Sequence, residues 1–348
     1  MLKVLTNHLR QSAALSSEQV AGAVAALLDE ATPVAEKADC LAALAATGET
    51  VEEVAAFARE LRARAIQPPL DARTRSGAIL DVCGMGGDRL NTFNISTTVA
   101  LILAAAGVAV AKHGNRAISS QTGSADVLEA LGIPIDLSPE QAAASLRDYN
   151  FAFFFAPNYH PAFKFVAPAR KLCAERGQRT IFNILGPLLN PAKPSAQLVG
   201  VPRPELCEPI GHVLQSLGGR RGMVVCGKVD QAWLDELSIF GENVVAEFYQ
   251  DRGFAVSRSA FEGFPFQPAT LQDLAGGDRE TNAQTVRGLL HGKERGPKRD
   301  AVLLNAAAAL FVADRTRSVM DGWSLGEDLL DSGAAAAKLD QLALSRPS

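Results

Sequence analysis

Over the first seventy residues, apolar side chains recur at intervals of three and four positions, as they do on one face of a helix. The pattern predicts three helices: one after the capping-box sequence at residues 16–19, one from Pro33 to Gly48, and one after the capping-box sequence at residues 50–53. The run Gln67-Pro68-Pro69 then breaks the pattern. Residues 1–72 are therefore expected to form a small all-helical domain. Such short helices have little core of their own, so we expect part of their surface to pack on the other domain or in a homodimer.

From residue 78 onward, short apolar runs alternate with helical stretches, which is typical of an α/β domain with a mainly parallel central sheet flanked by helices. The runs are Ile79–Cys83, Val108–Ala111, Phe151–Phe155, Met223–Cys226 and Val244–Phe248. We assign this domain to residues 73–348. Ligands of such sheets bind at the carboxyl ends of the strands, and the first two runs are followed directly by polar loops.

Charge and cysteine content narrow the choice of function. The formal net charge of −4 provides no overall positive field for nucleic acid or for an anionic membrane, so we expect neither as a partner. The five cysteines are widely spaced and include no C-x-x-C pair, which argues against disulfides and zinc. The start has no apolar leader, and no apolar run approaches about 18 residues. We therefore expect a cytoplasmic protein.

The first polar loop is rich in glycine and precedes a helix. It reads Gly84-Met85-Gly86-Gly87-Asp88, followed by the stretch from Asn91 to Thr97. Glycines let backbone amides approach a phosphate, and a helix N-terminus adds further free amides. A dinucleotide fingerprint is excluded, because Arg89 stands where its last glycine is required. The alternative is a plain turn in which Asn94 and Ser96 only cap the helix.

The second polar loop follows the run Val108–Ala111. It carries Lys112-His113-Gly114-Asn115-Arg116, then Ser119-Ser120 and Gly123-Ser124. A cation, an amide and several hydroxyls at the end of a strand favour phosphate binding. Two glycine-bearing polar loops on neighbouring strands therefore predict a shared anion site.

The two loops resemble those of the anthranilate phosphoribosyltransferase family. The likeness extends from about residue 47 to about residue 342. It includes these further segments: residues 160–164, Ala167-Pro168-Ala169-Arg170, residues 179–183, residues 186–191, Asn282-Ala283 and residues 300–306. The resemblance implies a nucleoside phosphorylase/phosphoribosyltransferase type of fold. It also implies that a helical stretch near residues 163–178 joins the helical, dimerising domain.

The resemblance implies that the 5-phosphoribosyl group passes from phosphoribosyl pyrophosphate (PRPP) to the amine of anthranilate. The products are N-(5-phosphoribosyl)anthranilate and pyrophosphate, and the step belongs to tryptophan biosynthesis. The family's pattern also assigns residues to each ligand. For PRPP these are Gly84, Gly87, Asp88, Thr92, Asn94, Ser96, Thr97, Lys112, Ser120 and Ser124. For anthranilate they are Gly84, His113, Asn115, His160 and Arg170, and for Mg²⁺ they are Ser96, Asp235 and Glu236.

Several of these assignments have a simpler alternative. His113 and His160 could each be only part of a pocket wall, since a lone histidine is more often packed than catalytic. Arg170 alone would be taken for a surface ion-pairing residue. Asp235-Glu236 alone would be taken for a solvated acidic pair at a helix start. No nucleophile with a paired base stands out, so no residue is given a covalent catalytic role, and catalysis is expected from positioning and electrostatics.

The chain departs from the family's usual pattern at three positions. Met85 and Arg89 replace the threonine and the final glycine of the first loop, and Trp233 replaces a glycine before Asp235. That final glycine permits a positive φ angle, so Arg89 either reshapes the loop or adds a phosphate contact. Two rival functions stay open at this point, a pyrimidine nucleoside phosphorylase-like enzyme and a non-catalytic relative that binds nucleic acid.

Overall fold

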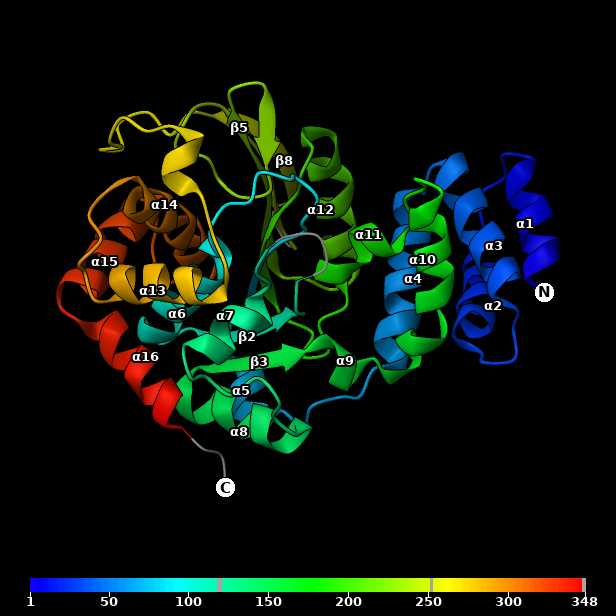
Figure 1. Cartoon of the computed structure of the whole chain (residues 1–348), viewed down its shortest axis with the longest axis horizontal. Coiled ribbons are helices and arrows are strands. Elements are labelled where there is room, and N and C mark those ends of the chain that lie inside the picture. The colour runs from blue at the N-terminus through cyan, green and yellow to red at the C-terminus, as the bar shows by residue number, and fades with distance from the viewer. Residues whose placement is uncertain (118–120, 251–252, 346–348) are drawn as a thin grey trace.

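The computed structural model describes residues 1–117, 121–250 and 253–345. It consists of a helical bundle, which carries the N-terminus, beside a larger body built on a sheet (Figure 1). The fold class predicted from the sequence is confirmed. None of the helices in these residues is both long and apolar enough to span a membrane.

The helical bundle contains α1 (Leu2–Arg10), α2 (Ser17–Leu28), α3 (Val34–Thr47) and α4 (Val51–Arg64). The capping boxes predicted for α2 and α4 are both formed. The later helix α10 (Ala167–Glu175) packs on α3 (Figure 1). Buried Lys37 of α3 also donates hydrogen bonds to the carbonyls of Asp29 at 2.7 Å and Phe165 at 2.8 Å. The segment around α10 is thus fixed to the bundle.

The body contains an eight-stranded sheet in the order β3-β2-β1-β4-β5-β7-β8, with β6 paired to β5. Its strands are β1 (Ile79–Gly84), β2 (Ala109–Gly114), β3 (Phe151–Phe155), β4 (Ala196–Gly200), β5 (Arg221–Val229), β6 (Ala232–Leu234), β7 (Asn243–Tyr249) and β8 (Gly253–Ser259). The strands from β3 to β5 are parallel, whereas β6, β7 and β8 pair antiparallel. The loops after β1 and β2 therefore leave the sheet side by side.

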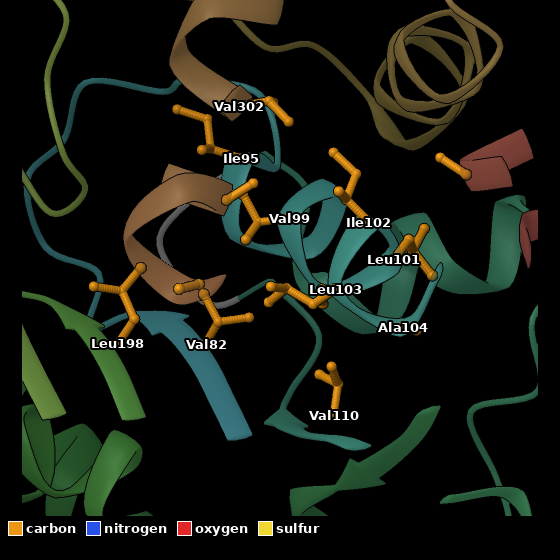
Figure 2. Packing of buried hydrophobic residues seen from close by; sticks show 14 of the residues in the cluster. Val82, Ile95, Val99, Leu101, Ile102, Leu103, Ala104, Val110, Leu198 and Val302 are labelled. Carbon is orange, nitrogen blue, oxygen red and sulfur yellow. The ribbon is translucent and has the colours of Figure 1, made fainter. Parts of the chain in front are cut away.

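Helices cover both faces of the sheet. One face carries α6 (Ile95–Ala105), α13 (Arg279–Leu290), α14 (Pro297–Val312), α15 (Val319–Asp331) and α16 (Ala334–Leu344). Figure 2 shows Val99 and Leu103 of α6 packed near Val82 of β1, with Val302 of α14 in the same cluster. The opposite face carries α12 (Cys207–Ser216). The buried apolar side chains of α12 belong to the same hydrophobic cluster as those of the helical bundle. Helix α8 (Pro139–Tyr149) packs on β3. Shorter helices lie in the connections: α5 (Ala72–Ser76), α7 (Ser124–Ala130), α9 (Ala156–Tyr159) and α11 (Phe182–Leu185).

Three expectations about individual elements were wrong. The first ten residues were assigned no helix, yet Leu2, Leu5 and Leu9 lie on the buried face of α1. Strand β4 was missed because Gln197 interrupts a short apolar run; its buried amide donates to the carbonyl of Pro187 at 3.1 Å. Pro33 stands at the N-cap of α3, one position before the first helical turn to which it was assigned.

Candidate active site

The loop that carries Asp235 and Glu236 lies against the carboxyl ends of β1 and β4. The backbone N–H of Gly86 donates a 2.5 Å hydrogen bond to the Asp235 carboxylate. A Cβ on Gly200, the last residue of β4, would lie 1.6 Å from the backbone oxygen of Asp235, and one on Gly84 would lie 2.5 Å from its carboxylate. Glycine is therefore required at both strand ends, because the acidic loop fills the space that a side chain would occupy.

Asp235 and Glu236 are buried and share their surroundings with Asp88. Burial raises the pKa of Asp235 well above its usual range, and the charges of Asp88 and Glu236 raise it further. Burial likewise raises the pKa of Glu236 to about 7, against the opposing effect of Lys112. Ionisation of these carboxyls is therefore costly, and a nearby cation would favour it. The alternative of a solvated pair at a helix start is wrong, since Asp235 and Glu236 follow β6 and are buried.

Lys112 connects the second polar loop to the first. It lies on β2, is buried, and its ammonium donates to the carbonyl of Val82 at 2.7 Å and to the hydroxyl of Ser96 at 3.4 Å. Burial lowers the pKa of Lys112, while the neighbouring carboxylate of Asp81 raises it. Ser96 in the first turn of α6 also hydrogen-bonds to Glu236. One ammonium, one hydroxyl and the acidic loop therefore meet at the ends of β1 and β2.

Asn94 ties the start of α6 to two other segments. It occupies the N-cap position, but its side chain makes no capping hydrogen bond. Its amide donates to the carbonyl of Thr122 at 3.2 Å and accepts from the side chain of Asn282, on α13, at 3.0 Å. The alternative in which Asn94 merely caps the helix is therefore wrong. Asn282 was not assigned a role from the sequence, although it stands in a segment that resembles the family.

The second loop is held to α7 by its own residues. The backbone carbonyl of Asn115 accepts hydrogen bonds from the backbone N–H of Ala125 at 3.3 Å and from the hydroxyl of Ser124 at 3.4 Å. Arg116 pairs with Asp126 and with both carboxylate oxygens of Glu129, each at 3.0 Å. Ser120, assigned to PRPP, lies outside the described residues.

The remaining residues assigned to PRPP lie along the first loop and α6. Gly87 adopts a positive φ of 94°, and Arg89 adopts one of 63°. Thr92 pairs with Ala275 in an isolated β-bridge, and Thr97 is buried in α6. Arg89 therefore keeps the backbone conformation that a glycine would favour, at the cost of strain in a residue with a side chain.

An aromatic wall connects the end of β2 with α10. The ring of His113 lies 5.5 Å from that of His160, which stacks at 4.8 Å on Phe163. Phe163 meets Phe182 edge to face at 5.6 Å, and the guanidinium of Arg170 lies 5.2 Å from the Phe182 ring. Phe163 and Phe182 were not assigned roles from the sequence, because only the folded chain brings them between the histidines and Arg170.

Both histidines of this wall are neutral at pH 7. Burial lowers the pKa of His113 to about 3, and the proximity of His160 lowers it further. Burial lowers the pKa of His160 to about 4, although its hydrogen bond to the carbonyl of Leu189 opposes the shift. The buried Nε2 of His113 has no hydrogen-bond partner in the described part of the chain. The wall is thus apolar and uncharged apart from Arg170.

Arg170 has no carboxylate partner among the described residues. No ion pair or side-chain hydrogen bond forms at its guanidinium there, whereas Arg176 at the end of the same helix pairs with Asp39 at 3.7 Å. Burial lowers the pKa of Arg170, but a guanidinium remains charged at pH 7. The surface ion pair considered from the sequence is therefore absent from the described residues, and the charge is free to accept an external anion.

No three His, Cys, Asp or Glu side chains in residues 1–117, 121–250 and 253–345 form a ready-made metal cage. That arrangement is compatible with Mg²⁺, which usually keeps several water ligands and binds one or two carboxylates together with substrate phosphates. Asp235, Glu236 and Ser96 supply oxygen ligands of the type that this ion prefers.

Comparison with known families gives two matches that together cover most of the chain. The a/b domain of a glycosyl transferase family matches residues 76–336, and the helical bundle domain of the same name matches residues 3–65. The anthranilate phosphoribosyltransferase of Dehalococcoides mccartyi is 44% identical over 344 residues, with 98% of this chain and 97% of the relative covered. That of Geotalea daltonii is 47% identical, with 90% of each chain covered.

Two solved structures have the same overall fold. The anthranilate phosphoribosyltransferase of Thermus thermophilus superposes with a TM-score of 0.87 at 40% identity, covering 97% of this chain and 98% of the other. The enzyme from Saccharomyces cerevisiae in complex with PRPP and Mg superposes with a TM-score of 0.85, covering 98% of this chain and 97% of the other. At 24% identity the yeast likeness shows the fold alone.

Proposed function

The chain belongs to the anthranilate phosphoribosyltransferase family, and we propose that it performs the family's reaction with the residues gathered at the carboxyl edge of its sheet. The 5-phosphoribosyl group of PRPP is transferred to the amine of anthranilate, which gives N-(5-phosphoribosyl)anthranilate and pyrophosphate. The observation that carries this assignment is the pairing of two different subsites. A cationic, glycine-lined edge lies on β1 and β2, and an aromatic wall leads from it to the unpaired guanidinium of Arg170.

PRPP occupies the edge between the two polar loops. The backbone amides at Gly84 and Gly87 and the hydroxyls of Ser96 and Thr97 face its phosphate oxygens, together with Lys112. Such amides and a buried ammonium stabilise phosphate charge strongly in a site shielded from water. Asp88, Thr92, Asn94 and Ser124 complete this subsite, and the family's pattern also assigns Ser120 to PRPP.

Mg²⁺ binds at Asp235 and Glu236, with Ser96 nearby. Burial and, after it, the charge of Asp88 raise the pKa of both loop carboxyls, and a cation bound beside them would favour their ionised forms. The yeast relative was solved in complex with PRPP and Mg. The ion supplies neutralisation and orientation of the pyrophosphate oxygens.

Anthranilate lies along the aromatic wall with its carboxylate at Arg170. A planar guanidinium can hold a benzoate carboxylate through two parallel hydrogen bonds. The rings of His160 and Phe163 pack against the aromatic ring, and Asn115 and Gly84 border the path to PRPP. The buried Nε2 of His113, at one end of this wall, is a hydrogen-bonding group with no partner among the described residues.

Catalysis then rests on alignment and electrostatics. As the bond between ribose C1 and pyrophosphate breaks, Lys112 and the loop amides stabilise the negative charge that collects on the leaving group. The aromatic amine attacks C1 from the opposite face, held in line by Arg170. The chain needs no covalent intermediate. The same geometry disfavours a nucleoside phosphorylase, because an unpaired guanidinium beside an aromatic wall suits a benzoate better than a neutral nucleobase.

The decisive experiment compares Arg170→Ala with Arg176→Ala on the same helix, in a fluorescence assay of anthranilate consumption with PRPP and Mg²⁺. Loss of a charge-assisted pair worth about 1.5–3 kcal/mol predicts that Arg170→Ala raises the KM for anthranilate roughly tenfold to a hundredfold while the KM for PRPP changes little. Arg176→Ala should leave both unchanged. Equal effects on the two substrates would remove Arg170 from this role. Turnover of thymidine or uridine with phosphate would instead favour the phosphorylase.

The proposal extends to the assembly of the protein. A homodimer through the helical bundle fits the bundle's exposed apolar side chains, among them Met1 at the N-cap of α1 and Val4 on α1, which are 75% and 71% exposed. Sedimentation of the purified protein at several concentrations tests this directly.

A further inference from the structure

A second cavity, of about 1370 Å³, lies at the amino edge of the sheet, opposite the active site. It is bordered by the residues that begin the parallel strands, including Ala78 before β1, Ala109 of β2 and Ala196 of β4. Since β1 has six residues at about 3.3 Å each, roughly 20 Å separates this cavity from the glycine loop. A ligand bound here would not overlap PRPP.

The charged residues that line this cavity are mostly arginines. They are Arg73, Arg147, Arg220, Arg221, Arg315 and Arg317, against only Asp148 and Asp314. The chain as a whole has a net charge of −4, so this local excess of positive charge runs against the overall balance. Arginines from separate segments of the chain are brought together only by the fold.

Both aspartates are already paired with arginines of the lining. Arg147 binds Asp148 through two hydrogen bonds of 2.7 and 2.9 Å. Arg221 lies between the rings of Phe311 and Tyr249, at 4.0 and 4.6 Å, and pairs with Asp314 at 3.4 Å. Its buried Nε has no partner in the described residues. The two carboxylates therefore leave four arginines of the lining without an ion pair, and one of these, Arg73, has the nearby carboxylate of Asp71 as a counter-charge.

Among the described residues, the guanidiniums of Arg220, Arg315 and Arg317 meet only neutral groups or solvent. Arg220 donates to the carbonyl of Gly77 at 3.4 Å and to the hydroxyl of Ser195 at 3.3 Å, and Arg315 donates to the carbonyl of Ala106 at 2.9 Å. The side chains of Arg73 and Arg317 make no hydrogen bond or ion pair within the described residues, and both are exposed. Arg220 and Arg315 are thus held in place by the backbone without being neutralised.

We propose that this amino-edge cavity is a binding site for a small anion that carries two or more charges on phosphate or carboxylate groups. Arg220, Arg315 and Arg317 are its principal ligands, because a guanidinium matches either group with paired hydrogen bonds. The rings of Phe311 and Tyr249 each already carry the Arg221 guanidinium on one face. A compact polyanion therefore suits the cavity better than a nucleotide that must stack.

The test is isothermal titration of the full-length protein at low ionic strength, with pyrophosphate as the phosphate probe and citrate as the carboxylate probe. The protein is first freed of Mg²⁺ by dialysis, and no chelator is added, so that the ion does not assist pyrophosphate in the active site. The variants are Arg220→Ala/Arg317→Ala and a matched control, Arg203→Ala/Arg287→Ala, which removes two arginines elsewhere. Loss of two charge-assisted contacts predicts binding at least about tenfold weaker in the cavity variant and unchanged in the control.

A further variant separates charge from folding. Arg317→Glu removes no contact, so the melting temperature of this variant should equal that of the wild type. The probe that binds to the wild type should bind more weakly to this variant. If either probe binds to the wild type and binds more weakly to the cavity variants, the site is supported. The probe that binds then shows whether the site prefers phosphate or carboxylate groups. Equal binding of a probe to all variants would place that probe in the active site and overturn the proposal. Tight, strongly salt-dependent binding of a single-stranded oligonucleotide, with neither small probe bound, would also overturn it, in favour of a nucleic-acid surface.

Discussion

Asn305 on α14 hydrogen-bonds to both backbone groups of Leu237, the residue that follows Glu236. Its amide oxygen accepts from the Leu237 N–H at 2.9 Å, and its amide nitrogen donates to the Leu237 carbonyl at 2.9 Å. Asn243 at the start of β7 binds both backbone groups of Ser238 in the same way, at 2.7 and 2.9 Å. Two buried amides thus fix the backbone that carries the acidic pair, so the carboxylates keep their position despite their mutual repulsion.

Asn305→Ala should weaken Mg²⁺ use more than it weakens anthranilate binding. The substitution leaves the buried N–H and carbonyl of Leu237 without partners, at a cost of about 1–3 kcal/mol each, and frees the adjacent carboxylates to move. We expect the Mg²⁺ concentration for half-maximal activity to rise about tenfold, with little change in the KM for anthranilate. Activity titrated against Mg²⁺ at saturating PRPP measures this.

The control for Asn305→Ala is Ser145→Ala. Ser145 is also buried, and its hydroxyl donates to the carbonyl of Phe151 at 2.7 Å, away from the acidic loop. Ser145→Ala should lower the melting temperature of the protein without changing the Mg²⁺ dependence of its activity. If both variants shift that dependence equally, the effect of Asn305 arises from general destabilisation.

Arg89 offers a test of backbone conformation against charge. Its φ of 63° is unfavourable for a branched side chain and natural for glycine. Arg89→Val should therefore distort the glycine loop and raise the KM for PRPP about fivefold to thirtyfold, which corresponds to about 1–2 kcal/mol. Arg89→Gly should keep the KM near that of the wild type. A comparable rise in both variants would show that the guanidinium itself contacts PRPP.

The sequence predicted those parts of the site that are local in the chain. Gly84 and Lys112 each stand at the end of an apolar run, so their strands and loops were readable from the pattern alone. The two capping boxes were readable for the same reason. The role of Asn305 was not, because its partner is 68 residues away and nothing near residue 305 indicates a contact with Leu237.

Long-range contacts also account for what was missed elsewhere. The requirement for glycine at position 200 arises from Asp235, which approaches it only in the folded chain. Strand β4 itself was hidden by Gln197, whose polar side chain is satisfied by Pro187. The arginines of the amino-edge cavity come from segments that have no common motif. Hydrophobic periodicity reports which face of an element is buried, but it does not report which distant residue covers that face.

Stability should fall in mildly acidic solution partly because of His160. Burial lowers the pKa of His160 in the folded protein to about 4, whereas an unfolded histidine titrates near 6.5. Below pH 6.5 the unfolded chain therefore binds a proton that the folded chain does not, and protonation favours unfolding. The stabilisation is complete above pH 6.5 and is lost as the pH falls toward 4. Between pH 6.5 and 5 the loss amounts to roughly 2 kcal/mol.

His160→Gln removes this titration while keeping a donor for the carbonyl of Leu189, which His160 contacts at 3.1 Å. Urea unfolding at pH 7, 6 and 5 gives the free energy of unfolding of each protein. The stability of the wild type relative to the variant should decrease by roughly 2 kcal/mol over the acidic part of this range. His113 is common to both proteins, so both retain some acid sensitivity. Parallel curves would mean that His160 is protonated equally in the folded and unfolded states, and that its ring is accessible to water instead of packed against Phe163.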